Sequence, residues 1–253
     1  MISRGELRGV AERKRLSLEN AEKDYLLDLL LFQISTESGN SLVLKGGTCL
    51  YKLSSLNRFS EDLDFTLNSR RLDEEALARK IVRRLSLIGI EGRVKEIERS
   101  GKEINIRFLF KGPLFDGGQK SLCRIVVNIS QRERVLEELR REMVMPLSRE
   151  ISSFQVYAMS EREIAAEKVR AIMTRNKARD VFDLWFLMRR GVVLDLPMVG
   201  KKLRIYKLSF SLERFIASID EKRKSWETDL RGLIIGELVD FEKARDEIVD
   251  EMR

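Results

Sequence analysis

The sequence predicts an α+β fold, in which a mixed β-sheet flanked by helices is followed by a helical C-terminal domain. Three observations lead to this prediction. Apolar residues recur at helical spacing near the start of the chain, and several short segments of the first half have the two-residue period of a β-strand. After Arg149 the pattern becomes helical. We therefore predict an α/β domain over residues 1–155 and a helical domain over residues 156–253.

The first half contains the segments predicted to build the sheet. Residues 17–36 have a broad apolar stripe with helical spacing, and Ser17 is suited to cap this helix. The apolar residues 42–44 predict a buried strand that ends in a tight turn at Gly46 and Gly47, and a short helix begins at Thr48. Residues 62–67 predict a second strand, residues 73–87 a helix, and residues 104–110 and 122–129 two further strands.

The second half is predicted to be helical. Residues 160–163 have the capping-box pattern that opens a helix, which extends to about residue 173. A second helix is predicted over residues 178–190, with Gly191 as its stop. The rest of the sequence has helical periodicity.

The composition excludes several classes of chemistry. The chain of 253 residues contains no histidine, which excludes Ser-His-Asp and Cys-His catalysis and histidine-ligated metals. Its two cysteines, Cys49 and Cys123, lie far apart and suggest neither a disulfide framework nor a zinc site. The chemistry must therefore use carboxylates, lysine, arginine, backbone amides or a hard metal ion.

The overall charge and hydropathy point to a cytoplasmic protein that binds polyanions. No apolar run approaches the roughly 20 residues of a membrane span, and the N-terminus lacks the apolar core of a secretory signal. We therefore expect a cytoplasmic protein with no membrane partner. The net charge of +7 favours nucleotides or nucleic acid, although a thermophilic source would also explain the charge density.

A pair of aspartates predicts a metal site. On a strand, Asp62 and Asp64 project to the same side, while Leu63 and Phe65 project to the other. A divalent cation relieves the repulsion between two such carboxylates, and Mg²⁺ is commonly held by one or two carboxylates and substrate phosphates. The glycine turn and the helix that follows it suit a phosphate group. Together these features favour a site for a metal-bound nucleoside triphosphate.

The stretch that carries these features, LVLKGGTCLYKLSSLNRFSEDLDFTL, resembles the signature of the AbiEii/AbiGii toxin family, within the polymerase-β-like nucleotidyltransferases. The segments INIRFLFKGP, CRIVVNISQRE and MSEREIAAEKVRAIMTRNKARDVFDLWFL are also similar. The resemblance covers residues 25–188 and continues weakly over residues 226–230. It implies a nucleotidyltransferase-type fold, Mg²⁺-dependent transfer from an NTP, an RNA acceptor such as the acceptor end of tRNA, and a role as the toxin paired with an antitoxin.

The resemblance also implies which residues act. Asp62 and Asp64 match the family's metal-binding pair. Lys168 matches its helical lysine and Asp180 its later acidic residue, and these four residues form the implied catalytic set. The nucleotide-binding set is Lys45, Gly46, Gly47, Thr48, Arg58 and Lys168. Without the resemblance, we would interpret Lys168 as a salt-bridged residue. We would likewise interpret Asp180 and Asp183 as ion-pair partners of Arg175 or Arg179. Arg58 is suited equally to contacting phosphate and to bracing Asp62.

One position departs from the superfamily pattern. Related enzymes often carry a third carboxylate on a neighbouring strand, where it activates the attacking hydroxyl, but this chain has Asn128 at the expected position. A neutral amide cannot act as that base. Either the third role is absent, or Asp180 or Glu133 takes it.

Two alternatives to RNA modification stay open. The motif describes the nucleotide donor and says little about the acceptor, so transfer onto a protein hydroxyl is one alternative. A nucleotide- or RNA-binding module without turnover is the other. Basic clusters occur near residues 79–84, 140–141, 189–190 and 201–204, but interspersed glutamates weaken the case for one continuous RNA-binding stripe.

Overall fold

The computed structural model describes residues 1–252, and the chain divides into two compact units. We call the first the sheet unit; it consists of Met1–Ser55, Phe59–Arg134 and Leu139–Ala158. The second, the helical unit, consists of Leu56–Arg58, Val135–Glu138 and Met159–Arg253. The domains predicted over residues 1–155 and 156–253 stay a prediction.

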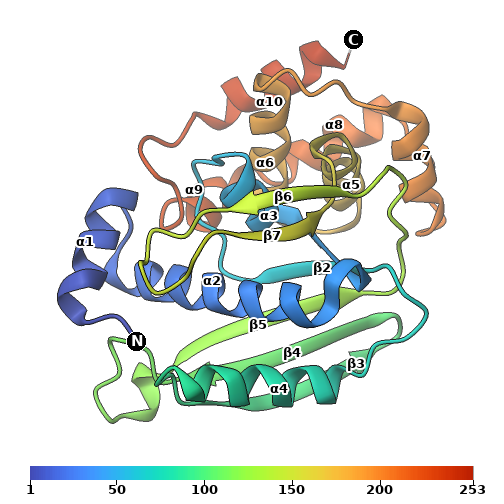
Figure 1. The fold of residues 1–253 in the computed structure, drawn as a ribbon. Coiled ribbons are helices and arrows are strands. Elements are labelled where there is room, and N and C mark those ends of the chain that lie inside the picture. The colour runs from blue at the N-terminus through green and yellow to red at the C-terminus, as the bar shows by residue number, and fades with distance from the viewer. Residues whose placement is uncertain (253) are drawn as a thin grey trace. The chain divides into compact units, whose positions relative to one another are not determined.

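The sheet unit is built on a seven-stranded mixed sheet with the strand order β3-β4-β5-β2-β1-β7-β6 (Figure 1). Its strands are β1 (Leu42–Lys45), β2 (Leu63–Leu67), β3 (Gly92–Ser100), β4 (Glu103–Phe110), β5 (Cys123–Ser130), β6 (Arg140–Val144) and β7 (Phe154–Ala158). The pairs β2/β5 and β1/β7 are parallel, and the other neighbours are antiparallel. The mixed sheet with flanking helices confirms the predicted fold class.

Three strands were not predicted from the sequence. β3 and β6 are the two edges of the sheet, where few side chains are buried, so their apolar patterns are weak. β7 lies in a region where we expected helix, so the prediction of helical character from Arg149 onward is wrong for Phe154–Ala158. This strand forms because it pairs with β6, the strand before it in the chain, and with β1, which is distant in sequence.

Four helices belong to the sheet unit: α1 (Arg4–Lys14), α2 (Leu18–Ser38), α3 (Gly46–Leu53) and α4 (Glu74–Leu87). Ser17 caps α2 as predicted, because its hydroxyl accepts a hydrogen bond from the amide of Asn20 at 3.1 Å. α2 contacts β5 and β7, and α4 contacts β3. Arg99 of β3 pairs with Glu74 and Glu75 of α4, which identifies the face of the sheet that this helix covers.

The two faces of β4 and β5 differ in character. Toward α4, β4 presents four buried apolar side chains, Ile104, Ile106, Phe108 and Phe110. The other side of the same strands carries Asn105 and Leu109 of β4, and Arg124 and Asn128 of β5, which are half-buried or exposed. We call this second side the polar face.

The helical unit contains α5 (Glu161–Thr174), α6 (Ala178–Arg189), α7 (Leu196–Arg204), α8 (Leu212–Asp220), α9 (Trp226–Leu230) and α10 (Phe241–Glu251). α5 packs against α6, α7 and α8, and α6 packs against α9 and α10. The predicted cap of α5 is present, since the Ser160 hydroxyl accepts a hydrogen bond from the amide of Glu163 at 3.0 Å. Over residues 1–252, no helix has the length and apolar character required to cross a membrane.

Candidate active site

The turn at the end of β1 brings backbone directly against a carboxylate. Gly46 has a φ of +69°, in the left-handed region that L side chains rarely adopt. A Cβ atom at this position would lie 2.9 Å from Oδ2 of Asp64 and 3.3 Å from its Cβ. Only glycine therefore fits between the start of α3 and the aspartate, both for its conformation and for the space available.

Helix α3 begins at this turn and is fixed at both ends. At its start, the buried hydroxyl of Thr48 donates a hydrogen bond to the backbone carbonyl of Asp62. Near its end, the Lys52 ammonium lies 2.6 Å from Asp24 and 2.5 Å from Asp28, both on α2. The amides of the first turn of α3 form a helix N-terminus next to the aspartate pair, which is a favourable place for an anion such as phosphate.

Strand pairing places the predicted residues in one row across the sheet. Lys45 is paired with Asp64, Asp64 with Asn128, and Asn128 with Asn105. The amide nitrogen Nδ2 of Asn128 donates a hydrogen bond of 2.9 Å to Oδ1 of Asp64. Asn128 thus lies on the neighbouring strand, at the position where related enzymes often carry a third carboxylate. It orients the Asp64 carboxylate and adds no charge.

Asp64 is the carboxylate of this row, and Asp62 is the second aspartate of the predicted pair. Asp62 lies in the bend immediately before β2, two residues from Asp64, and both side chains are half-buried. In the part of the chain from residue 1 to residue 252, no group of three or more acidic, cysteine or histidine side chains is arranged to hold a metal. Two carboxylates without further protein ligands fit Mg²⁺, which keeps several waters and takes phosphate oxygens from its substrate.

The helical unit holds a second group of predicted residues. The Lys168 ammonium, on α5, lies 2.9 Å from Oδ1 of Asp180 and 2.6 Å from Oδ2 of Asp183, both on α6. Lys168 is 7% exposed, and the two aspartates are 1% and 0% exposed. The salt-bridged state that its helical face suggested is present, and the binding of triphosphate by Lys168 stays a prediction.

Two arginines complete this network, of which Arg58 is buried and Arg175 is exposed. Arg58 forms a bidentate pair with Asp183, with both nitrogen–oxygen distances at 2.9 Å. Arg175 donates hydrogen bonds of 2.7 and 2.9 Å to Asp180. This pairing was one of the alternatives that the sequence left open for Asp180. The pairing of Arg58 with Asp183 was not predicted, because 125 positions separate the two residues in the sequence.

The charges of this network determine how its carboxylates titrate. Burial alone would raise the pKa of Asp183, but Arg58 and Lys168 outweigh it and hold that pKa below its usual value. Burial likewise opposes ionisation of Asp180, and Lys168 and Arg175 reverse the effect, so the pKa of Asp180 is strongly lowered. Asp180 is therefore a weak proton acceptor, which makes it a poor general base.

Sequence reasoning missed two other buried charge clusters. Lys14 and Lys52 pair with Asp24 in the sheet unit. In the helical unit, Lys202 pairs with Glu163 at 2.7 Å and with Glu167 at 2.9 Å. The sequence contained one indication of the first cluster. Asp24 and Asp28 interrupt a strongly apolar helix and, being four residues apart, lie on the same face of it.

Comparison with known families gives one match over most of the chain. A family model described as "Nucleotidyl transferase AbiEii toxin, Type IV TA system" matches residues 29–250. An uncharacterized protein of Aquifex aeolicus (strain VF5) is 27% identical over 219 residues, which is 84% of this chain and 80% of that protein.

Solved structures share the fold at low sequence identity. MenT4, a nucleotidyltransferase toxin from Mycobacterium tuberculosis H37Rv, has a TM-score of 0.69 at 20% identity, covering 99% of this chain and 88% of that one. A putative nucleotidyltransferase from H. pylori has a TM-score of 0.63 at 21% identity, covering 93% of this chain and 94% of that one. At these identities the likeness establishes the fold.

Proposed function

Because this chain belongs to the AbiEii family of nucleotidyltransferase toxins from type IV toxin–antitoxin systems, we propose that it transfers a nucleotide from an NTP to the end of an RNA. We further propose Mg²⁺ as its metal, tRNA as the acceptor and the cytoplasm as its location. Family membership also implies a cognate antitoxin.

The observation that carries the proposal is the packing of Gly46 against Asp64. A helix N-terminus and a carboxylate pair meet where the backbone leaves no room for a side chain. Two aspartates would repel an anion that carried no cation, and the amides of a helix N-terminus do not attract a cation on its own. A triphosphate that carries its own divalent cation satisfies both halves of this arrangement.

Asp62 and Asp64 would hold the metal ion. When bound, Mg²⁺ would neutralise phosphate charge and stabilise the pyrophosphate that leaves. The carboxylate of Asp64 keeps a fixed orientation through its hydrogen bond from Asn128. We propose that Lys168 contacts the phosphates, as its resemblance to the family's helical lysine implies. Its two aspartate partners use two of its three N–H donors.

The reaction class is an in-line displacement at phosphorus. An acceptor hydroxyl forms a new bond to the α-phosphorus, the bond to the pyrophosphate oxygen breaks, and the hydroxyl proton leaves to solvent or to a phosphate oxygen. Asn128 cannot take that proton because its amide is neutral. The lowered pKa of Asp180 makes that carboxylate a weak acceptor as well. In this proposal positioning and charge neutralisation supply most of the rate enhancement.

Label transfer tests the proposal directly. The purified chain is incubated with each of the four radiolabelled NTPs, Mg²⁺ and total tRNA, and the products are separated on a denaturing gel. We expect label on tRNA, its loss when EDTA is added, and its loss in Asp64→Asn. No transfer with any nucleotide, or equal transfer by Asp64→Asn, would contradict the proposal.

The same reaction separates the two alternatives. If the label appears on protein and resists ribonuclease, the acceptor is a protein hydroxyl. If Mg²⁺–NTP binds in equilibrium dialysis and no product forms with RNA or protein, the chain is a binding module. Glu12→Gln serves as the matched control, since Glu12 is an exposed carboxylate on α1 whose loss should leave transfer unchanged.

A further inference from the structure

The polar face continues from the aspartate row to a pocket at the far end of the same strands. Asn128 and Arg124 lie four residues apart on β5, so their side chains share this face. Pairing places Arg124 opposite Leu109, and Leu109 opposite Arg93 of β3. At ordinary strand dimensions this second row lies roughly 16 Å from Asp64.

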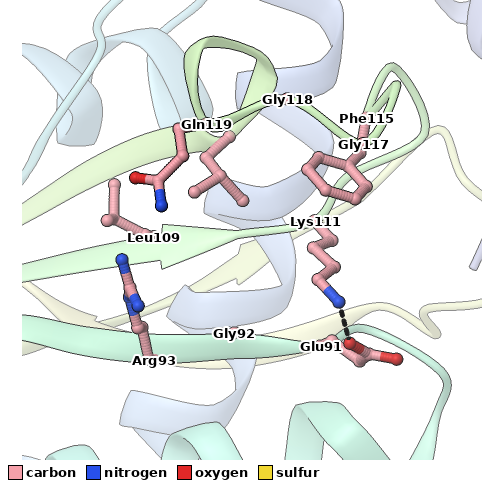
Figure 2. A pocket seen from close by; sticks show the side chains of 10 residues that line it. Glu91, Gly92, Arg93, Leu109, Lys111, Phe115, Gly117, Gly118 and Gln119 are labelled. Carbon is pink, nitrogen blue, oxygen red and sulfur yellow. Dashed lines mark hydrogen bonds and ion pairs between the residues drawn. The ribbon is translucent and has the colours of Figure 1, made fainter.

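A pocket of about 270 Å³ opens at this second row. Leu109 and Leu122 provide apolar surface, and the segment after β4 contributes Phe115 and Gln119 (Figure 2). The Lys111 ammonium lies 5.5 Å from the centroid of the Phe115 ring and forms an ion pair with Glu91. The pocket thus combines an aromatic ring, apolar surface and a side-chain amide.

Carboxylates neutralise several members of the basic clusters found in the sequence. Arg84 pairs with Glu37, Arg189 with Glu247, Arg190 with Glu161, and Lys202 is buried between two glutamates. On the polar face, Arg107 is neutralised by Glu96 and Glu98.

Two arginines of the second row differ from these. Arg93 and Arg124 are exposed, and within residues 1–252 neither forms an ion pair. They stand on either side of Leu109 in the pairing. Two unneutralised guanidinium groups beside an aromatic pocket are therefore available for phosphates.

We infer that this pocket and its two arginines bind a nucleotide of the single-stranded acceptor end, upstream of the nucleotide that reacts at the aspartate pair. This inference rests on the proposed function. Stacked nucleotides advance about 3.4 Å each, so the bound one lies about four or five positions from the reacting end. Base stacking on an aromatic ring and phosphate contacts to arginine are the means by which proteins hold single strands.

A single strand suits the site better than a duplex. The pocket is smaller than those that take drug-sized ligands, so it has room for one base but not for a base pair. Arg93 lines the pocket and Arg124 is paired with Leu109, which also lines it, so a backbone that follows this row contacts both guanidinium groups while one base is turned into the protein. In this role the pocket distinguishes RNA acceptors by the number of unpaired nucleotides at their 3′ end.

Binding of short RNA tests the inference. The probes are fluorescein-labelled RNA hairpins with 3′ single-stranded ends of two or six nucleotides, and affinity is measured by fluorescence anisotropy at several salt concentrations. We expect the six-nucleotide end to bind at least fivefold more tightly. The variant Arg93→Gln/Arg124→Gln should abolish this preference and reduce the salt slope by about 1.4, since each phosphate contact on a single strand contributes about 0.7.

A matched variant controls for charge. Arg79→Gln/Arg83→Gln removes two exposed arginines from α4, which covers the opposite side of the sheet, and should keep the length preference. Phe115→Ala should weaken binding of the six-nucleotide end alone.

The binding experiment tests the RNA-binding pocket independently of the proposed nucleotide transfer. A length preference that depends on Arg93 and Arg124 supports the inference even if no nucleotide is transferred. If transfer to RNA occurs but the double variant keeps the affinity, the length preference and the acceptor KM of the unmodified chain, the inference is wrong and the proposed function stands.

Discussion

Two pairs of closely spaced aspartates have opposite environments in this protein. Asp62, in the bend before β2, and Asp64, on β2, are half-buried, and the hydrogen bond that Asp64 receives comes from the neutral amide of Asn128. Asp180 and Asp183 stand one turn apart on a helix and are buried. Their charges are neutralised by Lys168, Arg58 and Arg175, as described above.

The difference teaches that spacing alone does not identify a metal-binding pair. In both cases two aspartates lie within three positions of each other in the sequence. The helical pair already contacts three cations, whereas Asp64 is half-buried, lies next to a helix N-terminus and receives its hydrogen bond from a neutral amide. We therefore expect the helical pair to contribute stability and the strand pair to contribute activity.

Removal of Asp183 should give the largest effect. Asp183→Ala leaves Arg58 and Lys168 buried without this counter-charge, which typically costs about 3–5 kcal/mol. Trp185 and Trp226, the two tryptophans of the chain, both lie in the helical unit, so urea unfolding followed by tryptophan fluorescence reports on that unit. Asp246→Ala, at an exposed ion pair with Arg245, should change stability by less than about 1 kcal/mol. Equal midpoints for the two variants would refute the structural role.

Removal of the Asp64 charge should affect rate and leave stability nearly unchanged. Asp64→Asn keeps the shape of the side chain, so we expect the initial rate of label transfer to fall about 10²–10³-fold. The urea midpoint should remain close to that of the unmodified chain, since Asp64 is half-buried and Asn128 can still pair with an amide. A variant that unfolds as easily as Asp183→Ala would remove the contrast between the two pairs.

The glycine turn offers a finer test. Gly46→Ala adds a Cβ at a φ of +69° and against Asp64, so we expect a loss of about 1–2 kcal/mol and a transfer rate lowered roughly tenfold. Gly101→Ala is the matched control, because Gly101 has a φ of +60° with nothing within 4 Å of the added atom. It should show similar strain and full activity. A normal rate in Gly46→Ala would argue against the close approach.

Acid should weaken the helical unit gradually. Because the folded pKa values of Asp180 and Asp183 are lowered, the stability they contribute is fully present above the unfolded value near 3.9. It is lost as pH falls below that value toward the folded pKa values, by up to about 1.4 kcal/mol per pH unit for each carboxylate. Urea midpoints between pH 5 and pH 2.5 measure this slope, and Asp180→Asn should make it shallower. An unchanged slope in that variant would show that folding does not lower the pKa of Asp180.

The sequence by itself determined the local features of the site. The first strand, the glycine turn and the strand that carries Asp64 depend on neighbours in sequence, and the structure has each of them. The helix predicted to begin at Thr48 begins at Gly46, and Asp62 lies in the bend before β2 and not on the strand. Local periodicity and the need for glycine at a positive φ carry this information. The same holds for the caps of α2 and α5, where a serine hydroxyl meets an amide three residues away.

Only the tertiary structure decided which charges meet. Arg58 and Asp183 are 125 positions apart, and the hydrogen bond between Asn128 and Asp64 spans 64. The pairing of β7 with β1 joins residues more than 100 positions apart, and no local pattern specifies it. Burial and charge pairing are properties of the packed chain. For that reason two aspartate pairs that look alike in the sequence receive different roles, one as part of a buried ionic network and the other as the proposed metal site.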